Sequence, residues 1–93
     1  MAAMSNAELL TAIKNGMGIG TDYQDSTIQI YIDDVKFFMS DAGVDESVVN
    51  DVAAVGCILR GVIDLWNYGS GNGQFSDYFK QRVTQLACKG ALE

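Results

Sequence analysis

The chain has 93 residues, of which 48% are hydrophobic, and its 12 acidic and 6 basic residues give a formal net charge of −6. This length predicts one domain with one core, and the acidic balance argues against nonspecific nucleic-acid binding, which depends on Lys and Arg displacing counterions from phosphates. The chain has no histidine and only two cysteines, Cys57 and Cys88, which excludes a zinc site of the usual ligand sets. No apolar run approaches the roughly 20 residues of a membrane span. A soluble protein with reduced thiols is expected.

The first expected helix begins at Ser5, which starts a capping box with Glu8, and continues with apolar residues at helical spacing as far as Met17. Glycines at positions 16, 18 and 20 are expected to end it.

A second helix is expected to start near Thr21 to Asp25, where Thr21 and Asp22 are candidate caps, and to end at Gly43. Residues 27–32 also alternate as a strand would, but the helical pattern continues beyond them and is too long for an ordinary strand. The apolar residues that carry this pattern are Ile28, Ile32, Val35, Met39 and Ala42.

A third helix is expected from a cap at Asp45 or Ser47 to the only tryptophan, Trp66. Three small residues, Ala53, Gly56 and Gly61, are expected to let neighbouring helices approach it closely. Its apolar residues form one unbroken four-three series, namely Val48, Val52, Val55, Leu59, Val62 and Trp66.

A glycine-rich segment, Gly69 to Gly73, separates this helix from a fourth one, which is expected from a cap at Ser76 or Asp77 to Gly90. The sequence therefore predicts an all-α protein, a compact bundle of four or five helices with a Gly-rich loop between the last two.

No enzyme, cofactor or metal site is predicted. Asp33 and Asp34 point about 100° apart on a helix and cannot form an acid–base pair, and the serines have no histidine to activate them. Arg60 and Asp64 are expected to form a pair on the helix surface with no functional role.

The aromatic residues beside the glycine-rich loop are candidates for partner contacts, because aromatic side chains bury much area for few rotatable bonds. Closing the core is an equally weighted interpretation. These residues are Trp66, Tyr68, Phe75 and Tyr78.

Three segments, Ala42 to Val44, Arg60 to Gly71 and Phe75 to Ala87, resemble the small head–tail connector proteins of tailed phages, often labelled DNA-packaging proteins. The resemblance extends from about Leu10 to Ala87 and includes the order and length of the helices. Its most specific part is the tryptophan and glycine segment. Residues 1–93 would then be a single helical connector domain, with residues 1–4 and 91–93 flexible or introduced by cloning.

This resemblance implies a structural virion protein without catalysis, located at the head–tail junction and in the host cytoplasm before assembly. Subunits would form a homo-oligomeric ring under the portal protein and extend the DNA channel, through which DNA passes without specific binding. The next head-completion or tail protein would bind the opposite end of the ring. No membrane contact is implied, and the chain could remain monomeric in solution until the portal provides a template.

The expected contacts fall on three sets of residues. Contacts with the next protein are expected at Trp66, Asn67, Tyr68, Gly69, Ser70, Gly71, Asn72, Gly73 and Phe75. Contacts with the portal are expected at Lys80, Arg82 and Lys89. Contacts between subunits are expected at Tyr31, Phe37 and Phe38, on the wide apolar stripe of the second helix.

Two alternatives remain open. A small helical regulatory or DNA-recognition module would need a recognition helix rich in Arg, Lys, Asn and Gln, and only residues 80–85 come near that composition. An inhibitor or chaperone-like binder of another protein is the second alternative.

Overall fold

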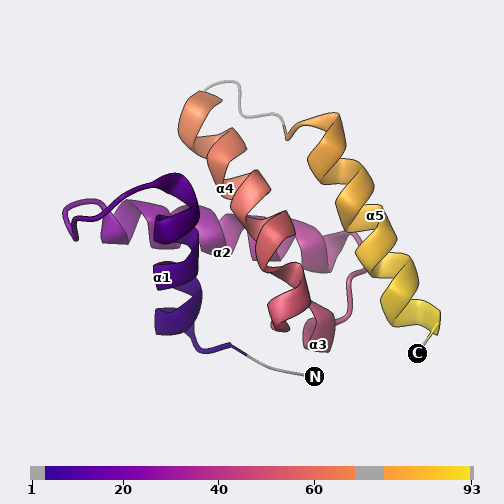
Figure 1. The fold of residues 1–93 in the computed structure, drawn as a ribbon. Coiled ribbons are helices and arrows are strands. Elements are labelled where there is room, and N and C mark those ends of the chain that lie inside the picture. Colours follow the sequence, from indigo (N-terminus) through magenta and orange to yellow (C-terminus); the bar gives the residue numbers. More distant parts are fainter. Residues whose placement is uncertain (1–3, 69–74, 93) are drawn as a thin grey trace.

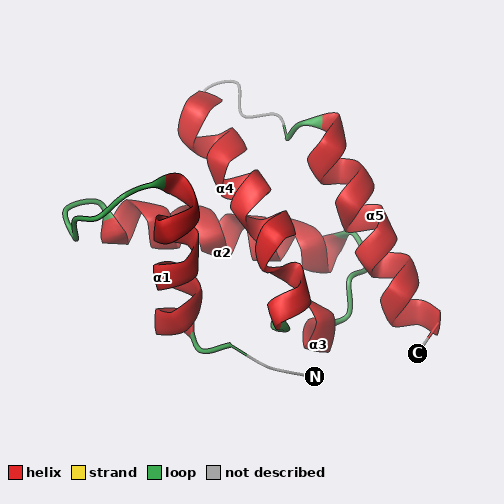
Figure 2. Ribbon diagram, in the orientation of Figure 1, coloured by secondary structure: helices red, strands yellow, loops and turns green. Residues whose placement is uncertain are grey.

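The computed structural model describes residues 4–68 and 75–92, with side chains up to residue 67 and again from residue 75 to residue 88. Within these residues the fold is all-α and has no strand, as predicted (Figure 2). The helices are α1 (Asn6–Met17), α2 (Asp25–Asp41), α3 (Glu46–Val49), the 3₁₀ turn η1 (Val52–Ala54), α4 (Val55–Tyr68) and α5 (Asp77–Leu92).

The predicted capping box starts α1. The Ser5 hydroxyl accepts the Glu8 N–H at 3.1 Å, and the Glu8 carboxylate accepts the Ser5 N–H at 3.1 Å. The helix ends where Gly18 adopts a left-handed conformation with φ 75°, which glycine tolerates without steric cost.

The start of α2 differs from the expectation of a side-chain cap. Gln24 is the N-cap residue and makes no side-chain cap hydrogen bond. Asp22 and Asp25 instead bind Lys14 of α1, whose Nζ lies 3.0 Å and 2.7 Å from their Oδ1 atoms. The two carboxylates raise the pKa of Lys14, with Asp25 contributing most. The acidic residues thus fix the corner between α1 and α2.

The expected third helix is wrong in one respect, because the chain breaks it into α3, η1 and α4. Asp51 is extended, with φ −85° and ψ 152°, and its carboxylate accepts the Ala53 N–H at 3.2 Å. Asp45, as one of the two predicted caps, starts α3 by accepting the Ser47 N–H at 2.9 Å. Val52, assigned to the apolar series, is 53% exposed.

The helices form two layers. In Figure 1, α2 runs behind α4, while α1, α4 and α5 lie in front of it. The Cα atoms span 40 × 30 × 17 Å, so the molecule is thin in one direction. This arrangement gives the protein two broad faces, one formed by α2 and the other by α1, α4 and α5 (Figure 1).

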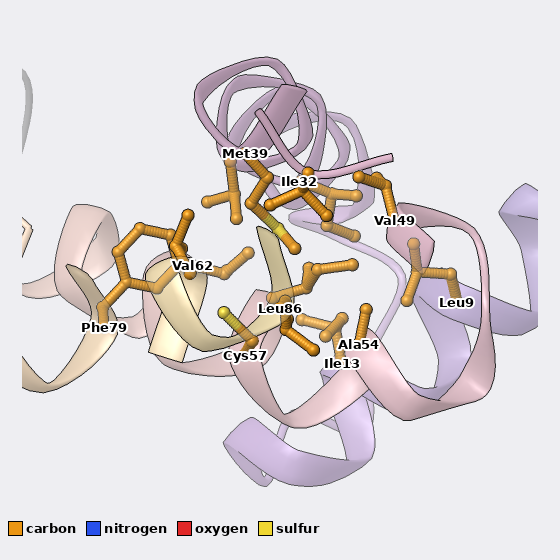
Figure 3. Close-up of a cluster of buried hydrophobic side chains, with 14 of the residues drawn as sticks. Leu9, Ile13, Ile32, Met39, Val49, Ala54, Cys57, Val62, Phe79 and Leu86 are labelled. Carbon is orange, nitrogen blue, oxygen red and sulfur yellow. The ribbon is translucent and has the colours of Figure 1, made fainter. Parts of the chain in front are cut away.

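The core lies between the layers and receives side chains from all the helices (Figure 3). At Gly61 of α4, an added Cβ would lie 2.7 Å from Cε1 of Phe79 and 2.9 Å from Cγ1 of Val35, so only glycine permits the observed packing. The predicted close approach is therefore confirmed at Gly61. At Gly56 it is wrong, because no neighbouring atom lies within 4 Å of an added Cβ.

Candidate functional site

A buried carboxylate joins α4 to the start of α5. Asp64 is 3% exposed, and its Oδ2 accepts the Ser76 N–H at 3.0 Å, while its Oδ1 lies 3.7 Å from Nε of Arg60. The expectation that Arg60 and Asp64 form a pair on the surface is wrong for Asp64. Because Ser76 directly precedes α5, Asp64 fixes the start of that helix against α4.

The first turn of α5 is capped by Ser76, whose hydroxyl accepts the Phe79 N–H at 3.2 Å. Ser76 was one of the two predicted caps. Arg60 extends over the ring of Tyr78, with its guanidinium carbon 5.9 Å from the ring centre. This contact is long, and Tyr78 remains 66% exposed.

Two aromatic residues expected to bind a partner pack on the chain's own core. Trp66 meets Tyr31 edge to face, with ring centres 6.3 Å apart. Phe75 lies 4.7 Å from Phe38 and 4.5 Å from Phe79, measured between ring centres. Both Trp66 and Phe75 are half-buried, so most of their surface packs against other residues of the same chain.

Of the other residues expected to bind a partner, only Asn67 has a described side chain. Asn67 is exposed at the end of α4. The side chain of Tyr68 and the residues Gly69, Ser70, Gly71, Asn72 and Gly73 lie outside the described part of the structure.

Of the three expected subunit contacts, only Phe37 is exposed, at 69%. Tyr31 and Phe38 are half-buried against Trp66 and against Phe75 and Phe79.

The outward side of α2 carries an apolar pair among acidic residues. Ile30 is 60% exposed and lies seven residues before Phe37, so both point the same way, opposite to the buried residues of the helix. Sequence analysis missed Ile30, although its spacing from Phe37 was a visible signal. We call this surface the α2 face and define it by Ile30, Asp33, Asp34, Phe37 and Asp41, all exposed.

A groove of about 440 Å³ runs between α4 and α5 on the other side of the molecule. Its floor includes Gly56, where no side chain fills the space between the helices. The wall from α5 is one helical face, with residues spaced three, four and seven apart. We call this the α4–α5 groove and define it by Ala53, Gly56, Tyr78, Gln81, Arg82 and Gln85.

The residues expected to face the portal lie on α5. Lys80 and Arg82 are exposed, and Arg82 donates from Nη1 to Oε1 of Gln85 at 2.9 Å. Lys89 lies on the same helix, in its last turns, and its side chain is not described. Arg82 therefore contributes to the groove, which the sequence did not predict.

Among residues 4–68 and 75–92, no group of three or more His, Cys, Asp or Glu side chains is placed to hold a metal ion. Burial raises the pKa of the Cys57 thiol to about 11, which leaves it protonated at neutral pH. Cys57 is thus a buried small side chain, as predicted, while Cys88 is exposed, and both thiols are free.

None of the helices in the described ranges has the length and apolar character needed to cross a bilayer. No protein-family model matches this chain, and neither a curated protein nor a solved structure is significantly similar to it.

Proposed function

We propose that this protein is a structural head–tail connector of a tailed phage. Its subunits would form a ring under the portal after DNA packaging, extend the DNA channel and join the head to the next head-completion or tail protein. The residue pattern from Leu10 to Ala87 supports this proposal, as do the all-α fold and the order of the helices.

The observation that carries the proposal is the presence of two unlike exposed faces on opposite sides of a thin helical subunit. A ring needs a heterologous interface, in which one surface of a subunit meets a different surface of its neighbour. The α2 face is apolar and acidic, with Ile30 and Phe37 at 60% and 69% exposure. The α4–α5 groove is hollow and carries Arg82.

The charge of the chain is compatible with a DNA channel. With a net charge of −6, a ring would have few cations available to hold the phosphates of passing DNA. Lys80, an exposed cation of α5 that does not line the groove, is the proposed contact with the portal. Asn67 and the loop that follows are the proposed contacts with the next protein.

The test is to mix the purified chain with portal protein and DNA-filled heads of the phage that carries this gene, and to image the portal vertex by electron microscopy. Added rings at the vertex are expected, and Lys80→Glu should reduce their number at least about fivefold if the charge reversal costs about 1 kcal/mol or more. Asn15→Glu, a change at an exposed position of α1, is the matched control.

Bare vertices in the presence of the unmodified chain would contradict the proposal. They would favour the alternative of a regulatory or DNA-recognition module, which a gel-shift assay with duplex DNA would then examine.

A further inference from the structure

The α2 face and the α4–α5 groove lie on opposite broad sides of the molecule. On α2, the buried residues Ile28, Ile32 and Val35 point toward α4, so the residues half a turn away, Ile30 and Phe37, point outward. The same reasoning applies to α4.

On α4, Ile58 and Val62 are buried against the core, and Gly56 lies about 160° around the helix from Ile58 at 100° per residue. Gly56 therefore opens to the side away from α2, where α5 forms the other wall of the groove. One subunit can present the α2 face while its own groove stays free for another subunit.

The two surfaces have opposite charge. The α2 face carries Asp33, Asp34 and Asp41, all exposed. The groove carries Arg82 of α5. Arg60 of α4 lies beside it, over the ring of Tyr78, and is partly neutralised by Asp64. Two α2 faces would repel each other, whereas an α2 face and a groove attract.

The groove is also large enough for apolar side chains. Its volume of about 440 Å³ is in the range of pockets that enclose ligands, and the missing side chain at Gly56 lets a partner helix approach the backbone of α4. An exposed aromatic such as Phe37 is a suitable anchor for such a pocket.

We infer that the occupant of the α4–α5 groove is a second copy of this chain, which places Phe37 and Ile30 of its α2 face over Gly56 and its carboxylates near Arg82. This inference rests on the proposed ring and names its subunit interface. Because the contact joins unlike surfaces, each subunit retains one free face of each kind, and association continues until the ring closes.

Two variants isolate the two surfaces. Gly56→Leu fills the groove, and it is expected to fold because no atom lies within 4 Å of an added Cβ. Phe37→Asp adds a charge to the α2 face, and it is expected to fold because Phe37 is 69% exposed. Phe37→Asp keeps an intact groove, and Gly56→Leu keeps an intact α2 face. Neither variant can therefore bind further copies of itself, but a mixture of the two can form a one-to-one pair.

The experiment is a nuclear magnetic resonance titration of ¹⁵N-labelled Phe37→Asp with unlabelled Gly56→Leu, up to about 1 mM. Saturable shifts are expected in the labelled groove, at the amides of Gly56, Gln81 and Arg82. With the labels exchanged, the shifts should move to α2. Adding Arg82→Glu to the labelled protein should weaken the pair at least about tenfold, since it places a like charge beside the acidic α2 face.

The matched control replaces Phe37→Asp by Tyr23→Asp. Tyr23 is 89% exposed but lies outside the α2 face, so this variant should keep the ability of the unmodified chain to self-associate. An absence of shifts at about 1 mM would overturn the inference. The inference would also be overturned if Phe37→Asp abolished self-association and Gly56→Leu left it intact, because that pattern indicates two α2 faces in contact.

The outcome is separable from that of the proposed function. Rings at the portal vertex without pairing through these surfaces would leave the connector role in place and reject this interface. Pairing without portal binding would support the interface and reject the connector role.

Discussion

At the scale of single residues, two glycines of α4 differ in the space available for a side chain. Gly61 is enclosed by Phe79 and Val35, both fully buried, while Gly56 faces open space in the groove. Helix propensity favours alanine over glycine at both positions by about 1 kcal/mol. The surroundings therefore decide the sign of each substitution.

We predict that Gly61→Ala lowers the free energy of unfolding by about 1–3 kcal/mol, the usual cost of overpacking a core, whereas Gly56→Ala raises it by about 0.5–1 kcal/mol. Val35 cannot move aside easily, because its β-branched side chain is stiff and surrounded. Urea denaturation of the two variants measures both changes. An equal stabilisation of both variants would contradict the close approach at Gly61.

Asp64 provides a second prediction at this scale. Removing its carboxylate leaves the Ser76 N–H without an acceptor and Arg60 without its anion. Asp64→Ala should therefore lower the free energy of unfolding by about 1–3 kcal/mol, the cost of an unsatisfied buried group. Asp64→Asn keeps an acceptor oxygen and should cost less. Asp34→Ala, at an exposed site, should change stability by no more than about 0.5 kcal/mol.

The role of Asp64 could not be predicted from the sequence. Its spacing from Arg60 is that of an ordinary surface pair on a helix, and this was the interpretation that the residues allowed. Its stronger partner, the Ser76 N–H, is 12 residues away, beyond the glycine-rich segment. Only the packing of α5 against α4 brings the two groups together.

At the scale of elements, local signals predicted the helices well and failed where one side chain competes with the pattern. The capping box at Ser5 and the cap at Ser76 depend on neighbouring residues and were visible in the sequence. The break in the helix at Asp51 was not visible in the sequence, because the apolar series continues through that position. The Asp51 carboxylate accepts the Ala53 N–H and starts a new turn, which the helical spacing of Val52 conceals.

The capping box predicts a dependence of stability on pH. The hydrogen bond from the Ser5 N–H holds the pKa of Glu8 below its ordinary value of 4.5 in the folded chain. Below about pH 4.5 the unfolded chain binds this proton more readily than the folded chain, so stability falls as the pH drops through the folded-state pKa. The contribution of Glu8 is fully present above the unfolded-state pKa.

Glu8→Gln should remove this part of the acid dependence, because the amide accepts the same hydrogen bond but does not titrate. The check is the urea midpoint of both proteins from neutral pH to below pH 4.5. Their difference should shrink as the pH falls. Parallel pH curves for Glu8→Gln and the unmodified chain would contradict the prediction.

At the scale of the whole molecule, α2 and α5 are held differently. Four residues of α2 are fully buried between the layers, whereas α5 contributes Phe79, Val83 and Leu86 and leaves its groove side in solvent. Elements that bury less apolar surface open at lower free energy than the rest of the fold. We therefore expect α5 to separate from α4 while α1, α2 and α4 remain folded.

Cys57 reports this opening. Its side chain is 3% exposed beside the groove, and burial raises its pKa to about 11, so it reacts with a thiol reagent only when α5 moves away. Cys88 is exposed and should react at once. Labelling with a disulfide reagent at neutral pH is therefore expected to show a fast and a slow phase, of which Cys88→Ser removes the fast one.

The slow phase should accelerate when the contact of α5 is weakened. Val83→Ala removes buried methyl groups of α5 and should speed it by about tenfold for each 1.4 kcal/mol lost. Ile28→Val removes one methyl group from α2, far from Cys57 in the sequence, and should affect the slow phase only through global unfolding. If both substitutions accelerate it in proportion to their effect on total stability, α5 opens only when the whole molecule unfolds. A larger effect of Val83→Ala would identify α5 as a unit that opens while the rest of the molecule remains folded.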